Sequence, residues 1–306
     1  MTAVLPSIRV ADENGEPVVR EGLSLCFFMR HSHPVVADKV WRALELYRRS
    51  IPSDALGWYG SDDGDTLPLD VDGWRHIHHQ MVERAWGVEW LVELTEFSSG
   101  PGGYQFEYDG RRLEDPLFLG DADATTGLRF CLPSEYLTSR GVAAVRDLAR
   151  DIARELPFSF GYASPALVAR PGAWFSVRRQ LLELLQRHPG LDLLNLTDTS
   201  RRIGVRARGA YWLTFLGPTL LDQLGGAPEL ARRLDLPGVS LAPLDEERWM
   251  LSLGECPDSM DSATQPVPAS YRELSRLLEP FLLEEGGSWP PWDAGVVRRW
   301  LRRHGA

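Results

Sequence analysis

The sequence predicts an α+β fold in which mixed or antiparallel sheets are flanked by helices. A strand, a helix and further strands follow one another from Leu23 and again from Leu128. Pairs of strand-like runs are separated by short turns rich in glycine or acidic residues, as in hairpins. No Pro/Gly/Ser-rich linker of the length that separates independent domains interrupts the 306 residues. We therefore expect one unit over residues 1–306. Two related halves, 20–126 and 127–306, also fit the pattern, although no residue-level repeat proves a duplication.

The first part of the chain is expected to hold a core strand and two helices. Residues 1–21 are polar and are interpreted as a loose leader or an edge strand. The apolar run 23–29 predicts the core strand, and Ser32-His33-Pro34 is a helix-start signal because proline is tolerated in the first helical turn. Apolar residues at spacings of three and four then predict helices over 34–49 and 73–85.

The middle of the chain supplies the strands around which the rest is organised. The runs 90–97 and 104–108 flank a Ser- and Gly-rich turn and predict a hairpin. Next, 128–132 predicts a buried strand, 141–156 an amphipathic helix, and 158–163 a half-buried strand. We expect Ser164-Pro165 to turn the chain at that point.

The last third alternates short strands with helices. Residues 211–216 predict a strand that Gly217-Pro218 ends, and 239–241 with 249–253 predict a second hairpin around Asp245-Glu246-Glu247. Helices are expected over 174–187, 219–224, 228–234, 270–284 and 293–303, with a Trp289-Pro290-Pro291-Trp292 corner between the last two.

Composition narrows the class of protein. The formal net charge is −10, which argues against direct nucleic-acid binding, because such proteins usually carry a basic stripe, and favours a basic partner. Cys26, Cys131 and Cys256 lack metal-type spacing and are interpreted as thiols in a reducing cytoplasm. No apolar run approaches the ~20 residues of a membrane helix, and no signal-peptide pattern is present. We expect a cytoplasmic protein that does not bind membranes.

No catalytic signature is present. The HExxH, GxSxG, Walker, GxGxxG and CxxC patterns are all absent. Cys131, between Phe130 and Leu132, is expected to be a buried and unreactive thiol. We therefore predict a protein that is not an enzyme and has neither a metal nor a cofactor. One metal-like group keeps a metal-dependent enzyme as an alternative, formed by His31, His33, His76, His78 and His79.

The most one-sided charge lies between Ser50 and Trp74, where Asp is frequent and Lys and Arg are absent. We expect a loop here, and large aromatic residues beside negative charge suit a protein interface. Solvated acids and a Trp58 that fills the core are the alternatives. The candidate partner-binding residues are Trp58, Tyr59, Asp62, Asp63, Asp65, Asp70 and Asp72, with Glu246 and Glu247 as a second choice.

Three segments, 128–133, 156–167 and 211–218 followed by Gly225-Gly226, resemble the proteobacterial type VI secretion immunity family of the TsiV type, long described as a domain of unknown function. The likeness covers roughly Gly22 to Leu283. It implies a cytoplasmic immunity protein that binds and neutralises a cognate nuclease effector of the VRR-Nuc type, a metal-dependent DNase related to PD-(D/E)xK enzymes. A DNA-cleaving toxin needs a basic groove, which an acidic face can cover. A non-catalytic adaptor without a toxin partner remains a further alternative.

Overall fold

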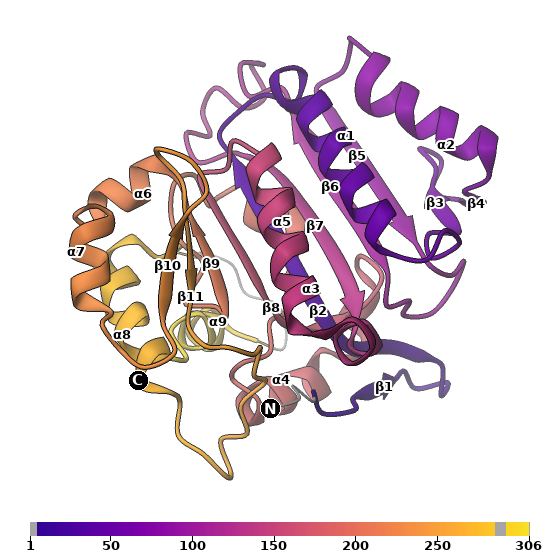
Figure 1. Cartoon of the computed structure of the whole chain (residues 1–306). Helices are drawn as coiled ribbons and strands as arrows, with labels where there is room; N and C mark the ends of the chain where they lie inside the picture. Colours follow the sequence, from indigo (N-terminus) through magenta and orange to yellow (C-terminus); the bar gives the residue numbers. More distant parts are fainter. Residues whose placement is uncertain (1–4, 285–291, 306) are drawn as a thin grey trace.

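The computed structural model describes residues 5–284 and 292–305, so Trp289, Pro290 and Pro291 of the expected corner lie outside the described residues. Its centre is an 11-stranded sheet in the order β10-β11-β9-β8-β2-β7-β6-β5-β3-β4, with β1 paired to β2 (Figure 1). Every pair of named strands is antiparallel. The predicted α+β class is confirmed. The strands are β1 (Arg9–Ala11), β2 (Pro17–Met29), β3 (Trp58–Gly60), β4 (Thr66–Pro68), β5 (Glu89–Thr95), β6 (Gln105–Arg111), β7 (Thr126–Pro133), β8 (Phe160–Val168), β9 (Leu213–Leu216), β10 (Ser240–Pro243) and β11 (Trp249–Ser252).

Strand β2 is the centre of the sheet. It pairs with β7 along one edge and with β8 along the other. Both neighbours come from the later part of the chain, so the ranges 20–126 and 127–306 contribute interleaved strands to one sheet. Side chains alternate between the faces of β2: Leu23, Leu25 and Phe27 belong to one apolar cluster, and Cys26 and Phe28 belong to another.

One face of the sheet is covered by two long helices, α1 (His33–Ser50) and α3 (Ser134–Glu155), which pack against each other (Figure 1). Val36, Val40, Leu44 and Tyr47 of α1 are buried, as the predicted stripe requires. Helix α3 starts seven residues earlier than the expected 141–156, because the chain is already helical before Gly141. Gly141 has φ 82°, a left-handed conformation that interrupts the helix and is accessible to glycine.

Several short helices pack beyond the other face and at the ends of the central strands. One apolar cluster joins the β8–β11 side of the sheet to α5, α6, α7 and α8, and another joins β1 to α4 and α9. Helix α5 and the two 3₁₀ turns η2 and η3 were not expected from the sequence. The bounds are η2 (Ala173–Val177), α4 (Arg178–Arg187), α5 (Leu196–Ser200), α6 (Pro218–Gln223), α7 (Gly226–Arg233), α8 (Ala269–Leu278), η3 (Glu279–Phe281) and α9 (Ala294–Leu301). No helix of the described chain has the length and apolar character needed to span a bilayer.

The turn expected at Ser164-Pro165 is wrong, since β8 continues through Pro165 to Val168. The carbonyl of Pro165 accepts a hydrogen bond from the Asp192 amide (2.8 Å), on the edge away from β2. In a strand the N–H and C=O of one residue point to the same edge. The position where Pro165 lacks an N–H therefore faces away from β2, past the end of the β8–β9 pairing, and no hydrogen bond between β8 and β2 is lost. Proline is therefore tolerated in a central strand.

The loop expected between Asp62 and Asp72 is also wrong. Residues Trp58–Gly60 form β3, which pairs with β5 on one side and with the outer strand β4 on the other. Helix α2 (Val71–His78) follows β4 closely. Strands of three residues are too short to show alternation in a sequence, and only pairing with β5 fixes them. The helix expected over 73–85 is shorter, since α2 gives way to a π-helical turn, η1 (His79–Glu83).

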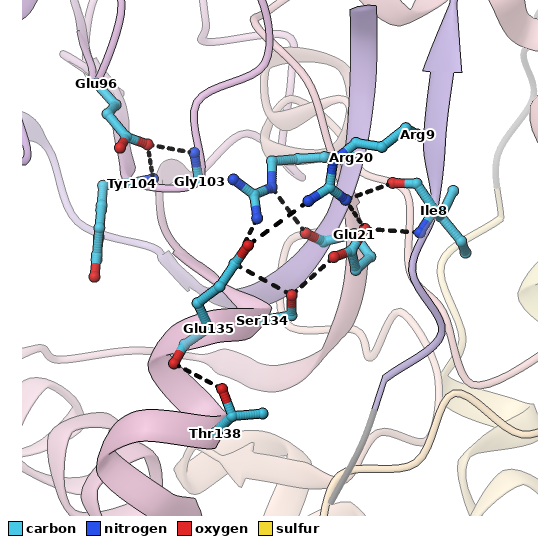
Figure 2. A network of polar contacts seen from close by, with 10 residues as sticks. All are labelled: Ile8, Arg9, Arg20, Glu21, Glu96, Gly103, Tyr104, Ser134, Glu135 and Thr138. Carbon is cyan, nitrogen blue, oxygen red and sulfur yellow. Dashed lines mark hydrogen bonds and ion pairs between the residues drawn. The ribbon is translucent and has the colours of Figure 1, made fainter.

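A polar network ties the N-terminal segment to the start of α3 (Figure 2). The buried Glu21 carboxylate accepts hydrogen bonds from the Ile8 amide (2.8 Å) and the Ser134 hydroxyl (2.8 Å), and it pairs with Arg9. Arg20 of β2 pairs with Glu135 of α3 at 2.5 Å. These contacts link β1 to the start of α3 through Glu21, and Arg9 also lies 3.7 Å from Glu135, so residues 9–11 are an ordered strand, in line with the edge-strand interpretation.

Candidate partner-binding site

The β3–β4 turn holds the three central acidic residues of the predicted site. Its backbone is closed by hydrogen bonds from Ser61 N to Asp65 O (2.8 Å) and from Gly64 N to Ser61 O (3.0 Å), with Gly64 at φ 85°. Asp62, Asp63 and Asp65 are exposed. None of the three has an ion-pair partner in the described residues. Their carboxylates are therefore available to a basic group of a partner.

Asp70 and Asp72 make local contacts at the start of α2. The Asp70 side chain accepts hydrogen bonds from the amides of Asp72 (3.0 Å) and Gly73 (2.9 Å), which makes Asp70 the N-cap of the helix. Asp72 forms an exposed ion pair with Arg75 in the same helix. Both carboxylates face solvent, but each already has a local partner.

Tyr59 and Trp58 differ in what they expose. Tyr59 is only 8% exposed and packs in the main apolar cluster, with its ring 5.4 Å from that of His76. Trp58 is half-buried at the edge of the sheet. Of these two aromatic residues, only Trp58 therefore has a side chain that a partner could contact.

Next to this turn lies a pocket of about 300 Å³ whose walls come from five segments. It is bounded by the β3–β4 turn, β5, β6, Pro171 and the first residues of α5. Four carboxylates line it, namely Asp62, Glu93, Glu107 and Asp109, and none of the described residues lining it is basic. We call this the carboxylate pocket.

The register of the sheet creates the pocket. Glu93 of β5 lies directly opposite Glu107 of β6, and Asp109 is two residues further along the same face. The four carboxylates run from exposed to buried: Asp62 is exposed, the Glu93 side chain is 28% exposed, and Glu107 and Asp109 are 8% and 2% exposed. A graded series of acids thus leads inward from the turn.

The deeper acids are compensated by arginines that lie beside them on the same face of the sheet. Arg111 pairs with Asp109 at 2.6 Å, and Arg129 pairs with Glu107. Burial nevertheless raises the pKa of both carboxyl groups, with the arginines opposing the change. The second oxygen of Asp109, Oδ1, has no hydrogen-bond partner in the described structure. The Thr197 hydroxyl is near enough to lower the pKa of Asp109 somewhat, without forming an aligned hydrogen bond.

Glu93 is the least compensated of the inner acids. Burial, together with the neighbouring Glu107 carboxylate, raises its pKa from 4.5 to about 7. Arg170 is 3.8 Å away and lowers the pKa only in part, since its nitrogens also donate to the Ser98 carbonyl and to the Thr66 hydroxyl (3.0 Å). Near neutral pH this side chain is poised between its neutral and charged forms.

Apolar surface borders the acids. Leu91 is 61% exposed and lines both the carboxylate pocket and a smaller hollow of about 180 Å³ that also includes Asp62 and Arg84. Trp86, which precedes β5, is 75% exposed, and Arg84 donates to its carbonyl at 3.1 Å. Apolar and acidic groups therefore share this end of β5, as they do in protein interfaces.

Glu246 and Glu247 lie far from this site. They are exposed in the β10–β11 turn, and the β10 and β4 strands form opposite ends of the sheet order (Figure 1). Glu247 lines a groove of about 760 Å³ together with the acids Glu155 and Asp245 and with a larger number of basic residues, Arg30, His31, Lys39, Arg42, Arg154 and Arg248. The structure does not bring the two acidic candidates together.

The histidines do not form the metal site that was kept as an alternative. Nδ1 of His33 shares a hydrogen bond with the Tyr108 hydroxyl (2.7 Å), its ring stacks on Trp90, and burial lowers its pKa to about 4. His78 and His79 both contact Glu83 (3.0 and 2.9 Å), whereas His76 packs near Tyr59 and His31 lines the basic groove. Within residues 5–284 and 292–305 no three His, Cys, Asp or Glu side chains are placed to hold a metal ion.

Cys131 is fully buried, as expected. Burial raises the pKa of its thiol to about 11, and that of the Cys26 thiol to about 12. Thiolates are the reactive form, so neither side chain is a nucleophile near neutral pH.

The sequence interpretation missed Glu93, Glu107 and Asp109. A signal was present, because β6 alternates polar and apolar residues from Gln105 to Arg111 inside the hairpin that was predicted correctly. Pairing the two strands in register would have placed Glu93 opposite Glu107 and left two acids facing each other. Such a pair is destabilising in a strand unless it has a function or a counterion.

Comparisons with known proteins agree with this structure. No sequence among curated proteins matches the chain. A solved structure, the type VI secretion system protein PA0821 of Pseudomonas aeruginosa, has the same fold: the TM-score is 0.81 at 20% sequence identity, over 97% of this chain and 87% of that chain. The family model TsiV, described as type VI immunity for VRR-NUC, matches residues 39–304, and the chain therefore belongs to this family of immunity proteins.

Proposed function

We propose that the protein neutralises a cognate VRR-Nuc effector by covering the DNA-binding surface of the nuclease with an acidic surface. This surface consists of Asp62, Asp63 and Asp65 in the β3–β4 turn together with the carboxylate pocket beside it. Trp58 and Leu91 supply apolar contact area at its border. The protein acts by binding, in stoichiometric amounts, and does not catalyse a reaction.

The observation that carries the proposal is the set of three exposed aspartates without ion-pair partners in the described residues, continued inward by Glu93, Glu107 and Asp109. A nuclease holds DNA through basic side chains that replace counterions along the phosphates. Closely spaced carboxylates offer those side chains a comparable negative field, and such complementarity gives fast association that weakens with salt.

Asp70 and Asp72 border the surface and contribute charge, although both have structural partners. Glu246 and Glu247 stay outside it. We place the encounter in the cytoplasm, because the DNA that such an effector attacks is held there. No part of this proposal requires a metal or a cofactor on the immunity protein.

A nuclease protection assay tests the proposal. Purified effector nuclease should cut plasmid DNA with its divalent metal, and an equimolar amount of the immunity protein should stop cleavage. The triple reversal Asp62→Lys, Asp63→Lys and Asp65→Lys should abolish protection at concentrations where the native protein protects fully.

The control is the double reversal Glu246→Lys and Glu247→Lys, which reverses two acidic charges, in place of three, at the other end of the sheet. It should protect like the native protein. Equal protection by all three proteins would show that the proposed surface is not the one that contacts the nuclease. Failure of the native protein to protect would refute the proposed function itself.

A further inference from the structure

We infer that the carboxylate pocket is the receptor for one arginine side chain of the partner nuclease, which enters past Asp62 and pairs with Glu93 and Asp109. The inference rests on the proposed function and deepens it, because it assigns a chemical group on the partner to a built site on this protein. The nuclease side chain would be one of those that otherwise contact DNA phosphate.

The first observation is the imbalance of charge in the pocket. Four carboxylates line it, and two neighbouring arginines on the same face of the sheet already have carboxylate partners: Arg111 pairs with Asp109 and Arg129 with Glu107. Asp62 has no ion-pair partner in the described chain, and Glu93 has one long pair, with Arg170 at 3.8 Å. One further positive charge would balance the site.

The second observation is the orphaned oxygen of Asp109. This side chain is 98% buried, lines the pocket, and uses Oδ2 for Arg111 (2.6 Å) and Ser200 (3.3 Å). Its Oδ1 atom has no aligned hydrogen bond among the described residues, although the Thr197 hydroxyl lies near Asp109. A buried carboxylate oxygen without a donor is costly, and a ligand that supplies an N–H group removes that cost.

The third observation concerns Glu93, which faces Glu107 on β6, Arg170, Arg129 and, across the pocket, Asp62. Burial and the Glu107 carboxylate raise the pKa of Glu93 to about 7. A cation that enters the pocket favours the charged form and lowers this pKa, so binding is coupled to release of a proton. Binding should therefore strengthen as the pH rises from 6 to 8.

The shape of the site favours a guanidinium over other cations. A planar fork with several N–H donors can contact two carboxylates at once, whereas an ammonium acts as a point charge. Leu91, Pro171 and Leu196 also line the pocket and can cover the aliphatic part of an arginine side chain. A metal ion is disfavoured, because no suitable group of three ligands occurs in the described residues.

Titration with methylguanidinium tests the pocket without the nuclease. The carboxyl carbon of Glu93 is followed by ¹³C NMR as pH is varied, with and without the probe. We expect a saturable response and a fall of about half a unit or more in the midpoint of Glu93 titration. N-methylurea, which has the same shape without the charge, should leave the midpoint unchanged. No saturable response, or the same response to both probes, would overturn the inference.

Variants separate the pocket from other acidic sites. Asp109→Asn and Glu93→Gln should each weaken methylguanidinium binding by about threefold or more, whereas Glu247→Gln in the other hairpin should not change it. Glu93→Gln is the safer variant, since Glu93 is partly exposed and its removal leaves no buried arginine unpaired. Unchanged binding in Glu93→Gln counts against the pocket even if Asp109→Asn fails to fold.

Binding of the effector nuclease completes the test. Glu93→Gln should lower the affinity for the nuclease by about tenfold, and the loss should be larger at pH 8 than at pH 6. If the triple reversal in the β3–β4 turn weakens nuclease binding and Glu93→Gln does not, the pocket inference fails while the proposed function stands. If neither weakens it, the pocket inference and the proposed acidic surface both fail, whereas the neutralising function itself is decided by protection with the native protein.

Discussion

Two acidic turns, β3–β4 and β10–β11, connect short strands at opposite ends of the same sheet. In the β10–β11 turn, Asp245 pairs with Arg248 at 2.5 Å, and Glu247 lines a groove whose charged residues are mainly basic. In the β3–β4 turn, Asp62, Asp63 and Asp65 have no ion-pair partner in the described residues, and the surface continues into further carboxylates. Basic and acidic side chains thus surround one turn, whereas the described residues that line the pocket beside the other include acids and no base.

The comparison shows that a run of acidic residues does not by itself define an acidic surface. Apart from the adjacent Arg248, the bases near Glu247 come from α1, α3 and the residue after β2, all more than 80 positions away in the sequence. The acids that reinforce Asp62 come from β5, β6 and their pairing. Coulomb interactions depend on distance in space, so only the fold decides which turn attracts a basic partner.

The largest expected effect is a loss of stability on removing a buried arginine that pairs with an acid of the carboxylate pocket. Arg111→Met leaves Asp109 without its 2.6 Å partner in a buried position, and should lower the free energy of unfolding by about 3–5 kcal/mol. Arg154→Met in the groove at the other end removes an exposed pair with Asp151 and should change it by less than about 0.5 kcal/mol. Urea unfolding followed by circular dichroism measures both. Equal costs would mean that the carboxylate pocket is not held by buried pairs.

The next effect concerns affinity and separates the two turns directly. The triple reversal to lysine at Asp62, Asp63 and Asp65 should weaken binding of the nuclease by about 100-fold at low salt, and should flatten the dependence of affinity on salt. The reversal of Glu246 and Glu247 should change affinity by less than about threefold. Calorimetric titrations at several salt concentrations provide the measurement. An unchanged salt slope in the triple variant would exclude electrostatic docking through this turn.

A smaller effect is expected on stability as a function of pH. The pKa of Glu93 is about 7 in the folded protein and 4.5 in the unfolded chain. Protonated Glu93 therefore favours the folded state. This contribution to the free energy of unfolding is complete below pH 4.5 and is lost as the pH rises through 7. Glu93→Gln should therefore be more stable than the native protein by about 1–3 kcal/mol at pH 8, and should differ little at pH 5. Glu247→Gln serves as the control and should show no such dependence. A Glu93→Gln variant that is destabilised at pH 8 would contradict the assignment.

The smallest effect tests whether Asp70 is a cap or a contact. Asp70→Ala should cost about 1 kcal/mol of stability, because two amides at the start of α2 lose their acceptor. Asp70→Asn keeps an acceptor and should recover most of that loss. Because Asn removes the charge alone, the affinity of Asp70→Asn for the nuclease isolates the electrostatic contribution of this position. Thermal unfolding of the two variants is the measurement.

Much of the fold could be predicted because local signals and tertiary contacts agree there. Both predicted hairpins form, α1 buries the expected stripe, and Cys131 lies inside a core strand. Predictions failed where a distant segment overrode the local preference. Pro165 remains in β8 because its missing donor faces the Asp192 segment, and β3 exists because β5 supplies its hydrogen bonds.

The sequence by itself determined the class of fold, the absence of catalytic signatures, the family and the concentration of aspartate before α2. Those features depend on residue type and on neighbours within a few positions. Only the tertiary structure decided that Tyr59 is buried, that Asp70 is a cap, and that Glu93, Glu107 and Asp109 line one pocket with Asp62. The reason is physical: burial, compensation of charge and the environment of a carboxyl group arise from atoms brought together by sheet register, and register is set by the whole chain.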